Sequence, residues 1–68
     1  MPLTHLEEMK LQKYFEECKV PEYKHDRIRK VAEMSKDGVP IKKIRQALRT
    51  SFNFVAEYRS TLRRWGVY

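Results

Sequence analysis

The stretch that decides the fold covers residues 39–68 and reads VPIKKIRQALRTSFNFVAEYRSTLRRWGVY. It predicts two short helices, over residues 40–48 and 52–64, joined by the polar connection Arg49-Thr50-Ser51. Apolar or semi-apolar residues recur at spacings of four, two, five and three, at Ile44, Leu48, Thr50, Val55 and Tyr58. This spacing lets two helices close over a shared core at a steep angle.

The same stretch carries a strong positive charge. Its basic residues outnumber its acids seven to one, and the one acid is Glu57. The basic residues are Lys42, Lys43, Arg45, Arg49, Arg59, Arg63 and Arg64. Two short helices with a cationic outer surface are typical of domains that bind nucleic acid.

Two further helices are predicted upstream. The first begins with a capping box between Thr4 and Glu7 and ends at Pro21. The second ends at Gly38, because glycine readily adopts the left-handed backbone that stops a helix. The expected fold class is all-α in a single domain, with a tri-helical unit over residues 22–66 preceded by one additional N-terminal amphipathic helix within residues 1–20.

Helical spacing predicts which side chains face the core. From the first two helices we expect Leu6, Met9, Leu11, Tyr14, Phe15, Cys18, Tyr23, Ile28, Val31, Ala32 and Ser35. From the last two we expect Ile41, Ile44, Ala47, Leu48, Val55, Tyr58, Leu62 and Trp65. Phe52 or Phe54 must be partly exposed, because both cannot face the same core.

Length and composition set further limits. A chain of 68 residues has room for one domain, and its 41% hydrophobic and 12% aromatic content favours a folded one. No apolar run approaches the roughly 20 residues needed to cross a bilayer. The first residues also lack the basic start and apolar centre of a secretory signal. We therefore expect an intracellular protein, cytoplasmic or nucleoid-associated.

The net charge of +6 is unevenly distributed. Residues 1–22 hold five glutamates and three lysines, whereas residues 23–68 hold twelve Lys or Arg and four acids. A basic body behind an acidic leading segment predicts two surfaces with different partners.

Residues 39–62 resemble the helix-turn-helix superfamily of DNA-binding proteins. The resemblance rests on the residues before the first motif helix, the apolar anchors and the cap of the second helix, which are Gly38, Pro40, Ile44, Leu48, Ser51 and Val55. Two positions depart from the superfamily pattern. Arg45 stands where a small residue is usual, and Arg49 stands where the turn usually has glycine. Arg45 must therefore point outward, or the two helices cross further apart than usual.

The resemblance implies that helix 52–64 enters the major groove of double-stranded DNA and reads bases with its outward residues. Asn53 would then pair with adenine, Glu57 would accept from cytosine, and Phe52 would contact a thymine methyl group. Alternatively, Asn53 is solvated and Glu57 forms an ion pair. The base-contacting set is Ser51, Phe52, Asn53, Ala56, Glu57 and Ser60.

Phosphate contacts would come from the seven basic residues of the same stretch, which set affinity and register rather than sequence choice. Four cations of the second helix can extend this surface, although helical geometry scatters them over more than one side. They are Lys24, Arg27, Arg29 and Lys30.

The first helix has two open roles, because a tri-helical unit is complete without it. It packs across the other helices and enlarges a small core, or part of it forms a two-fold dimer interface that places two recognition helices about one DNA turn apart.

The expected function is a small sequence-specific DNA-binding protein, a transcriptional regulator or an accessory factor of the kind that mobile elements encode. The alternatives are a protein adaptor that uses the first helix, and RNA binding. No enzyme activity, small-molecule substrate or cofactor is expected, because phosphate loops and paired catalytic carboxylates are missing. His5, His25 and Cys18 are too scattered for a metal site, and we expect both histidines to be solvated.

Overall fold

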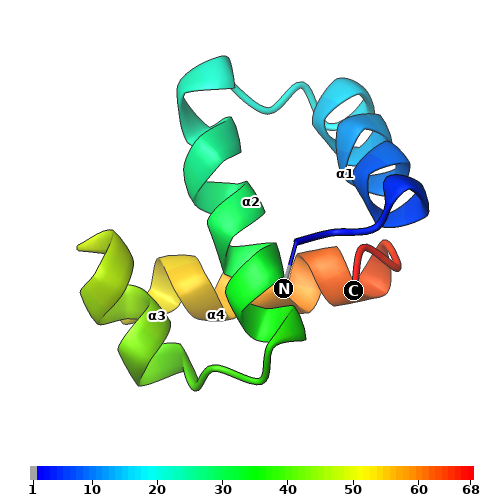
Figure 1. Cartoon of the computed structure of the whole chain (residues 1–68). Helices are drawn as coiled ribbons and strands as arrows, with labels where there is room; N and C mark the ends of the chain where they lie inside the picture. The colour runs from blue at the N-terminus through cyan, green and yellow to red at the C-terminus, as the bar shows by residue number, and fades with distance from the viewer. Residues whose placement is uncertain (1) are drawn as a thin grey trace.

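The computed structural model describes residues 2–68 and arranges them in four helices (Figure 1). These are α1 (His5–Glu17), α2 (Glu22–Lys36), α3 (Ile41–Leu48) and α4 (Phe52–Arg64). The described residues contain no strand, so the predicted all-α fold is confirmed.

The helix starts follow from local side-chain chemistry. Thr4 Oγ1 accepts a hydrogen bond from the Glu7 amide at 3.2 Å, and Glu7 Oε1 accepts from the Thr4 amide at 2.8 Å. At the start of α4, Ser51 Oγ accepts from the Phe54 amide at 3.1 Å. Both caps satisfy amides that a helix leaves without a partner in its first turn. The predicted capping box is therefore confirmed.

All four helices end in one backbone pattern. After each helix, one backbone amide donates a hydrogen bond to the carbonyl oxygen five residues earlier, as in the bond of 3.0 Å from Val67 to Leu62. This pattern needs a left-handed residue just before that amide. Glycine supplies it after α2 and α4, at Gly38 and Gly66, with φ of 80° and 72°. After α1 and α3 the left-handed residues are not glycines but Lys19 and Arg49.

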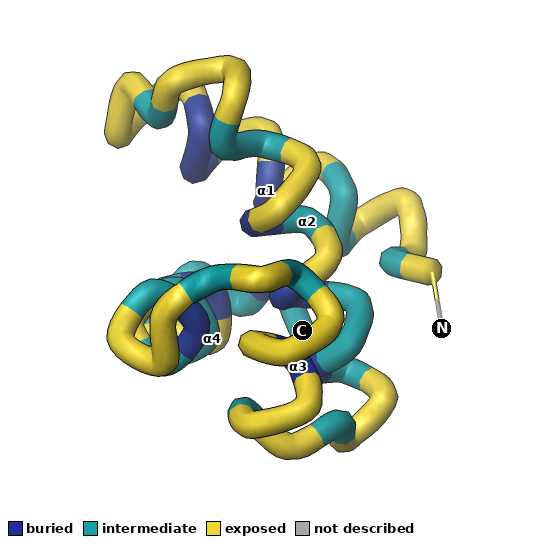
Figure 2. Tube along the Cα trace, turned by 90° about the vertical axis from the view of Figure 1, so that its left-hand side faces the viewer, coloured by how far each residue is buried: buried dark blue, intermediate teal, exposed yellow. Residues whose placement is uncertain are grey.

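Helices α2, α3 and α4 pack directly against one another, and α1 lies outside this unit, beside α2 and the C-terminal end of α4 (Figure 1). All four helices nevertheless contribute to one core, in which buried positions lie on the facing sides of the helices (Figure 2). The buried apolar residues are Leu11, Tyr14, Phe15, Ile28, Val31, Ala32, Ile44, Val55, Leu62 and Val67.

Aromatic contacts attach α1 to the tri-helical unit. The ring centroids of Tyr14 and Trp65 lie 5.5 Å apart, and the Phe15 ring stacks on His25 at 3.8 Å. His25 Nε2 also forms a hydrogen bond with the Val20 carbonyl oxygen at 2.9 Å. The prediction that this histidine is solvated is therefore wrong. Burial raises the pKa of Tyr14 to about 12, because the phenolate would have to form inside the core.

Two ion pairs join the acids of α1 to α2. Glu7 lies 2.6 Å from Lys36 Nζ, and Glu8 lies 2.5 Å from Arg29 Nη1. The hydrogen bond from Lys36, followed by that from the Thr4 amide, holds the pKa of Glu7 below its usual value. Two of the acids at the start of the chain are thus neutralised by ion pairs within the molecule.

Several predicted core residues are exposed. Leu6 and Met9 are 61% and 57% exposed, because they lie on the side of α1 opposite Leu11. Tyr23 is 79% exposed, in the first turn of α2. Two smaller predicted core residues, Cys18 and Ala47, are also exposed. The predicted core face was too wide because α1 is covered on one side only.

Candidate nucleic-acid interface

The outward side of α4 carries a continuous polar stripe. Asn53, Glu57 and Ser60 are exposed and follow one another at spacings of four and three residues, which places them on one face of the helix. This face is opposite the buried Val55 and Leu62. Three of the six predicted base-contacting residues therefore lie together on one exposed face of α4.

The other three predicted base-contacting residues differ in their surroundings. Ser51 is exposed, but its hydroxyl oxygen already accepts the capping hydrogen bond. Ala56 is half-buried. Phe52 is 54% exposed, whereas Phe54 packs on Tyr58 with ring centroids 4.7 Å apart. The prediction that one of the two phenylalanines is partly exposed is confirmed, and that residue is Phe52.

The outer side of α3 presents a line of cations. Lys42, Arg45 and Arg49 are exposed and succeed one another at spacings of three and four residues. Lys43 is exposed on a different side of the same helix. The prediction that Arg45 points outward is confirmed. No acid lies within α3, so its cationic line has no neutralising neighbour on its own helix.

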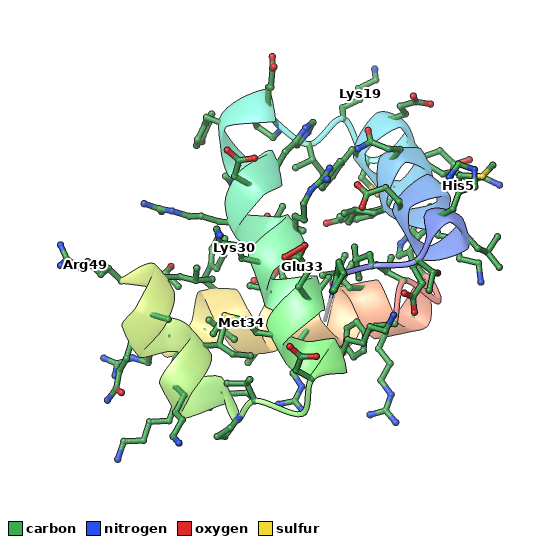
Figure 3. All side chains as sticks on the ribbon, viewed as in Figure 1. His5, Lys19, Lys30, Glu33, Met34 and Arg49 are labelled. Atoms are coloured by element: carbon green, nitrogen blue, oxygen red, sulfur yellow. The ribbon has the colours of Figure 1, made fainter. Side chains whose placement is uncertain are left out.

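The connection between α3 and α4 adopts a glycine-like conformation at a residue that is not glycine. Arg49 has φ 52° and ψ 49°, and Figure 3 shows it at the outer end of α3. The Thr50 amide donates to the Arg45 carbonyl at 3.2 Å, which closes the turn. The turn is therefore closed although its left-handed residue is an arginine, which also adds a charge at this point.

The basic residues near the end of α4 divide into two groups. Arg63 and Arg64 are exposed, and Arg64 continues the polar stripe one turn beyond Ser60. Arg59 is half-buried, and its carbonyl accepts a hydrogen bond from the Tyr68 hydroxyl at 2.8 Å.

The last two residues are part of the structure that sequence reasoning missed. Val67 is fully buried, and Tyr68 holds the last turns of α4 through its bond to Arg59. The available signal was Gly66 followed by an apolar residue, which is typical of a helix that ends by folding its tail onto its own last turns.

Among residues 2–68, no cluster of three or more His, Cys, Asp or Glu is arranged to hold a metal ion. No helix of this part of the chain combines the length and the apolar character that spanning a membrane demands. Comparison with protein-family models, with curated proteins and with solved structures finds no match to this chain.

Proposed function

We propose that the protein is a small sequence-specific double-stranded DNA-binding protein, a transcriptional regulator or DNA-binding accessory factor, that inserts α4 in the major groove. The observation that carries the proposal is the exposed stripe of Asn53, Glu57 and Ser60 on α4, together with the exposed line of cations on α3. Recognition helices read base edges mainly with residues of their N-terminal half, and this stripe begins in the first turn of α4.

The proposed roles follow from side-chain chemistry. Asn53 can donate to and accept from adenine, and Glu57 can accept from the amino group of cytosine. Phe52 offers an apolar surface to a thymine methyl group at the entrance of the groove. These contacts would determine which base sequence the protein prefers. The exposed cations supply affinity that does not depend on sequence, and they are Lys42, Lys43, Arg45, Arg49, Arg63 and Arg64.

The test is selection of binding sites from a randomised duplex pool, with titrations across a salt series. We expect an enriched site and a steep salt dependence. Asn53→Ala should cost about 1–3 kcal/mol at one base position and relax the preference there. Lys42→Ala should weaken binding to all sequences alike and reduce the salt slope by about 0.9. Lys13→Ala, an exposed change on α1, is the control and should alter neither.

Three results would contradict the proposal. Absence of duplex binding at low salt would end it and move the search to a protein partner. A steep salt slope without an enriched site would indicate an architectural role. Stronger binding to RNA than to duplex DNA of equal length would favour the RNA alternative.

A second candidate function, a protein adaptor, has one observation in its favour. Leu6 and Met9 are more than half exposed on the outer side of α1, where Met9 also lines a shallow hollow along the helix. The same surface would serve the two-fold dimer that is the alternative role of the first helix. Exchanging Arg49, Arg63 and Arg64 for Glu separates the two functions, because DNA binding should collapse while an adaptor that uses α1 should be unaffected.

A further inference from the structure

Four of the five cations of α2 lie on two sides of the helix, and the fifth, Lys24, is half-buried with its Nζ 5.9 Å from the centroid of the Tyr23 ring. Arg29 and Lys36 face α1, where each forms an ion pair with a glutamate. Arg27 and Lys30 are exposed on another side and form no ion pair within residues 2–68. Their charge is therefore available to a partner, whereas that of Arg29 and Lys36 is already neutralised.

The available cations belong to a short stripe. Tyr23, Arg27 and Lys30 follow one another at spacings of four and three residues, which places them along one side of α2. All three are exposed, and Tyr23 reaches 79%. Figure 3 shows Lys30 on the side of the molecule where Arg49 ends α3, away from α1 and His5. We call these three residues the α2 stripe.

The chemistry of the α2 stripe fits phosphate better than protein. Arginine, lysine and the tyrosine hydroxyl are common donors to phosphate oxygens. A protein interface would need a desolvated centre of apolar anchors, and the neighbouring apolar residue, Met34, is partly buried against the core. The stripe rises about 10 Å along the helix.

We propose that the α2 stripe binds the phosphate backbone of the duplex, outside the base pairs that α4 reads. This inference rests on the proposed function and enlarges its footprint. The acids of α1 determine which side of α2 attracts phosphate. Glu7 and Glu8 neutralise the side of α2 that faces α1, so phosphates are attracted to the opposite side.

The experiment compares the selected site on a short duplex with the same site extended by about 10 base pairs, one helical turn, on either side. The native protein should bind the extended duplex more tightly and with a steeper salt slope. The variant Arg27→Ala/Lys30→Ala should lose this gain, and its slope on the extended duplex should fall by about 1.8, or 0.9 for each lost phosphate contact. Its preference among sequences should be unchanged.

A charge-matched control separates contact from long-range attraction. Lys10→Ala/Lys13→Ala also removes two exposed cations, but from α1. This variant should retain the higher affinity for the extended duplex and the salt slope of the native protein. Equal losses in the two double variants would overturn the inference, as would an unchanged slope in Arg27→Ala/Lys30→Ala. Failure of the native protein to bind any duplex would instead overturn the proposed function itself. Helical circular dichroism confirms that each variant is folded.

Discussion

At the scale of single residues, the most informative positions are the two left-handed residues that are not glycine. An L-residue in this conformation pays a steric cost that glycine avoids. Arg49 and Lys19 occupy the same place in equivalent turns, with φ of 52° and 49°. They differ in their surroundings, because Arg49 lies between α3 and α4 at the candidate interface, whereas Lys19 lies between α1 and α2.

This pair makes a matched test of stability against binding. Arg49→Gly and Lys19→Gly should each stabilise the fold by about 1 kcal/mol, or about 4–8 °C in Tm for a domain of this size. Only Arg49→Gly should also weaken DNA binding, because it alone removes a proposed phosphate contact. Thermal melts and duplex titrations measure the two effects. A normal affinity for Arg49→Gly would remove Arg49 from the interface.

Ser35 is another residue at which a substitution should raise the free energy of unfolding. It is 7% exposed, and its hydroxyl has no hydrogen-bond partner within the described residues. Ser35→Ala should therefore stabilise the protein by about 1 kcal/mol. The control is Ser60→Ala, which gains the same helix propensity at an exposed position. The difference between their denaturation midpoints isolates the buried hydroxyl, and equal midpoints would show that this hydroxyl costs nothing.

At the scale of elements, we expect the attachment of α1 to depend on pH. The pKa of Glu7 is lowered in the folded protein, chiefly by its hydrogen bond from Lys36. Its contribution is therefore present above the ordinary pKa of 4.5 and is lost as the pH falls through the lowered value. We expect acid to loosen α1 first, with a change in the fluorescence of Trp65, which contacts Tyr14. In Glu7→Gln this acid transition should be weaker, and an identical transition would assign it to other groups.

The same helix responds to alkali through Tyr14. Its pKa is raised to about 12 in the folded protein, so the unfolded chain loses this proton at lower pH than the folded one. Stability should then fall as the pH rises from about 10 to about 12. Denaturant titrations at several pH values measure the slope. Tyr14→Phe should flatten it, and an equally steep fall in that variant would point to another tyrosine.

At the scale of the whole molecule, most of the unpaired positive charge of residues 2–68 lies on α3 and α4. The net charge is +6, and the ion pairs of α1 neutralise part of α2 but leave α3 and the outer side of α4 cationic. If the six exposed cations of α3 and α4 contact phosphates, affinity for duplex should fall about 10³-fold between 50 and 200 mM salt. Titrations at several salt concentrations measure this. A fall of less than about tenfold would mean that most of these cations do not touch DNA.

The sequence alone determined the local features of this fold. Caps, glycines and apolar spacing act over a few residues, so the helix bounds, the capping box, the stop at Gly38 and the outward direction of Arg45 could all be predicted. The exposed stripe of Asn53, Glu57 and Ser60 also follows from spacing along one helix.

Only the tertiary structure decided how wide each buried face is and which charges remain available. Leu6 and Met9 are apolar like Leu11, yet they are exposed because no other element within residues 2–68 covers the far side of α1. Arg27 and Arg29 are two residues apart, and only Arg29 meets a glutamate of α1. Burial and pairing depend on elements distant in the sequence, and local patterns carry no information about where those elements lie in space.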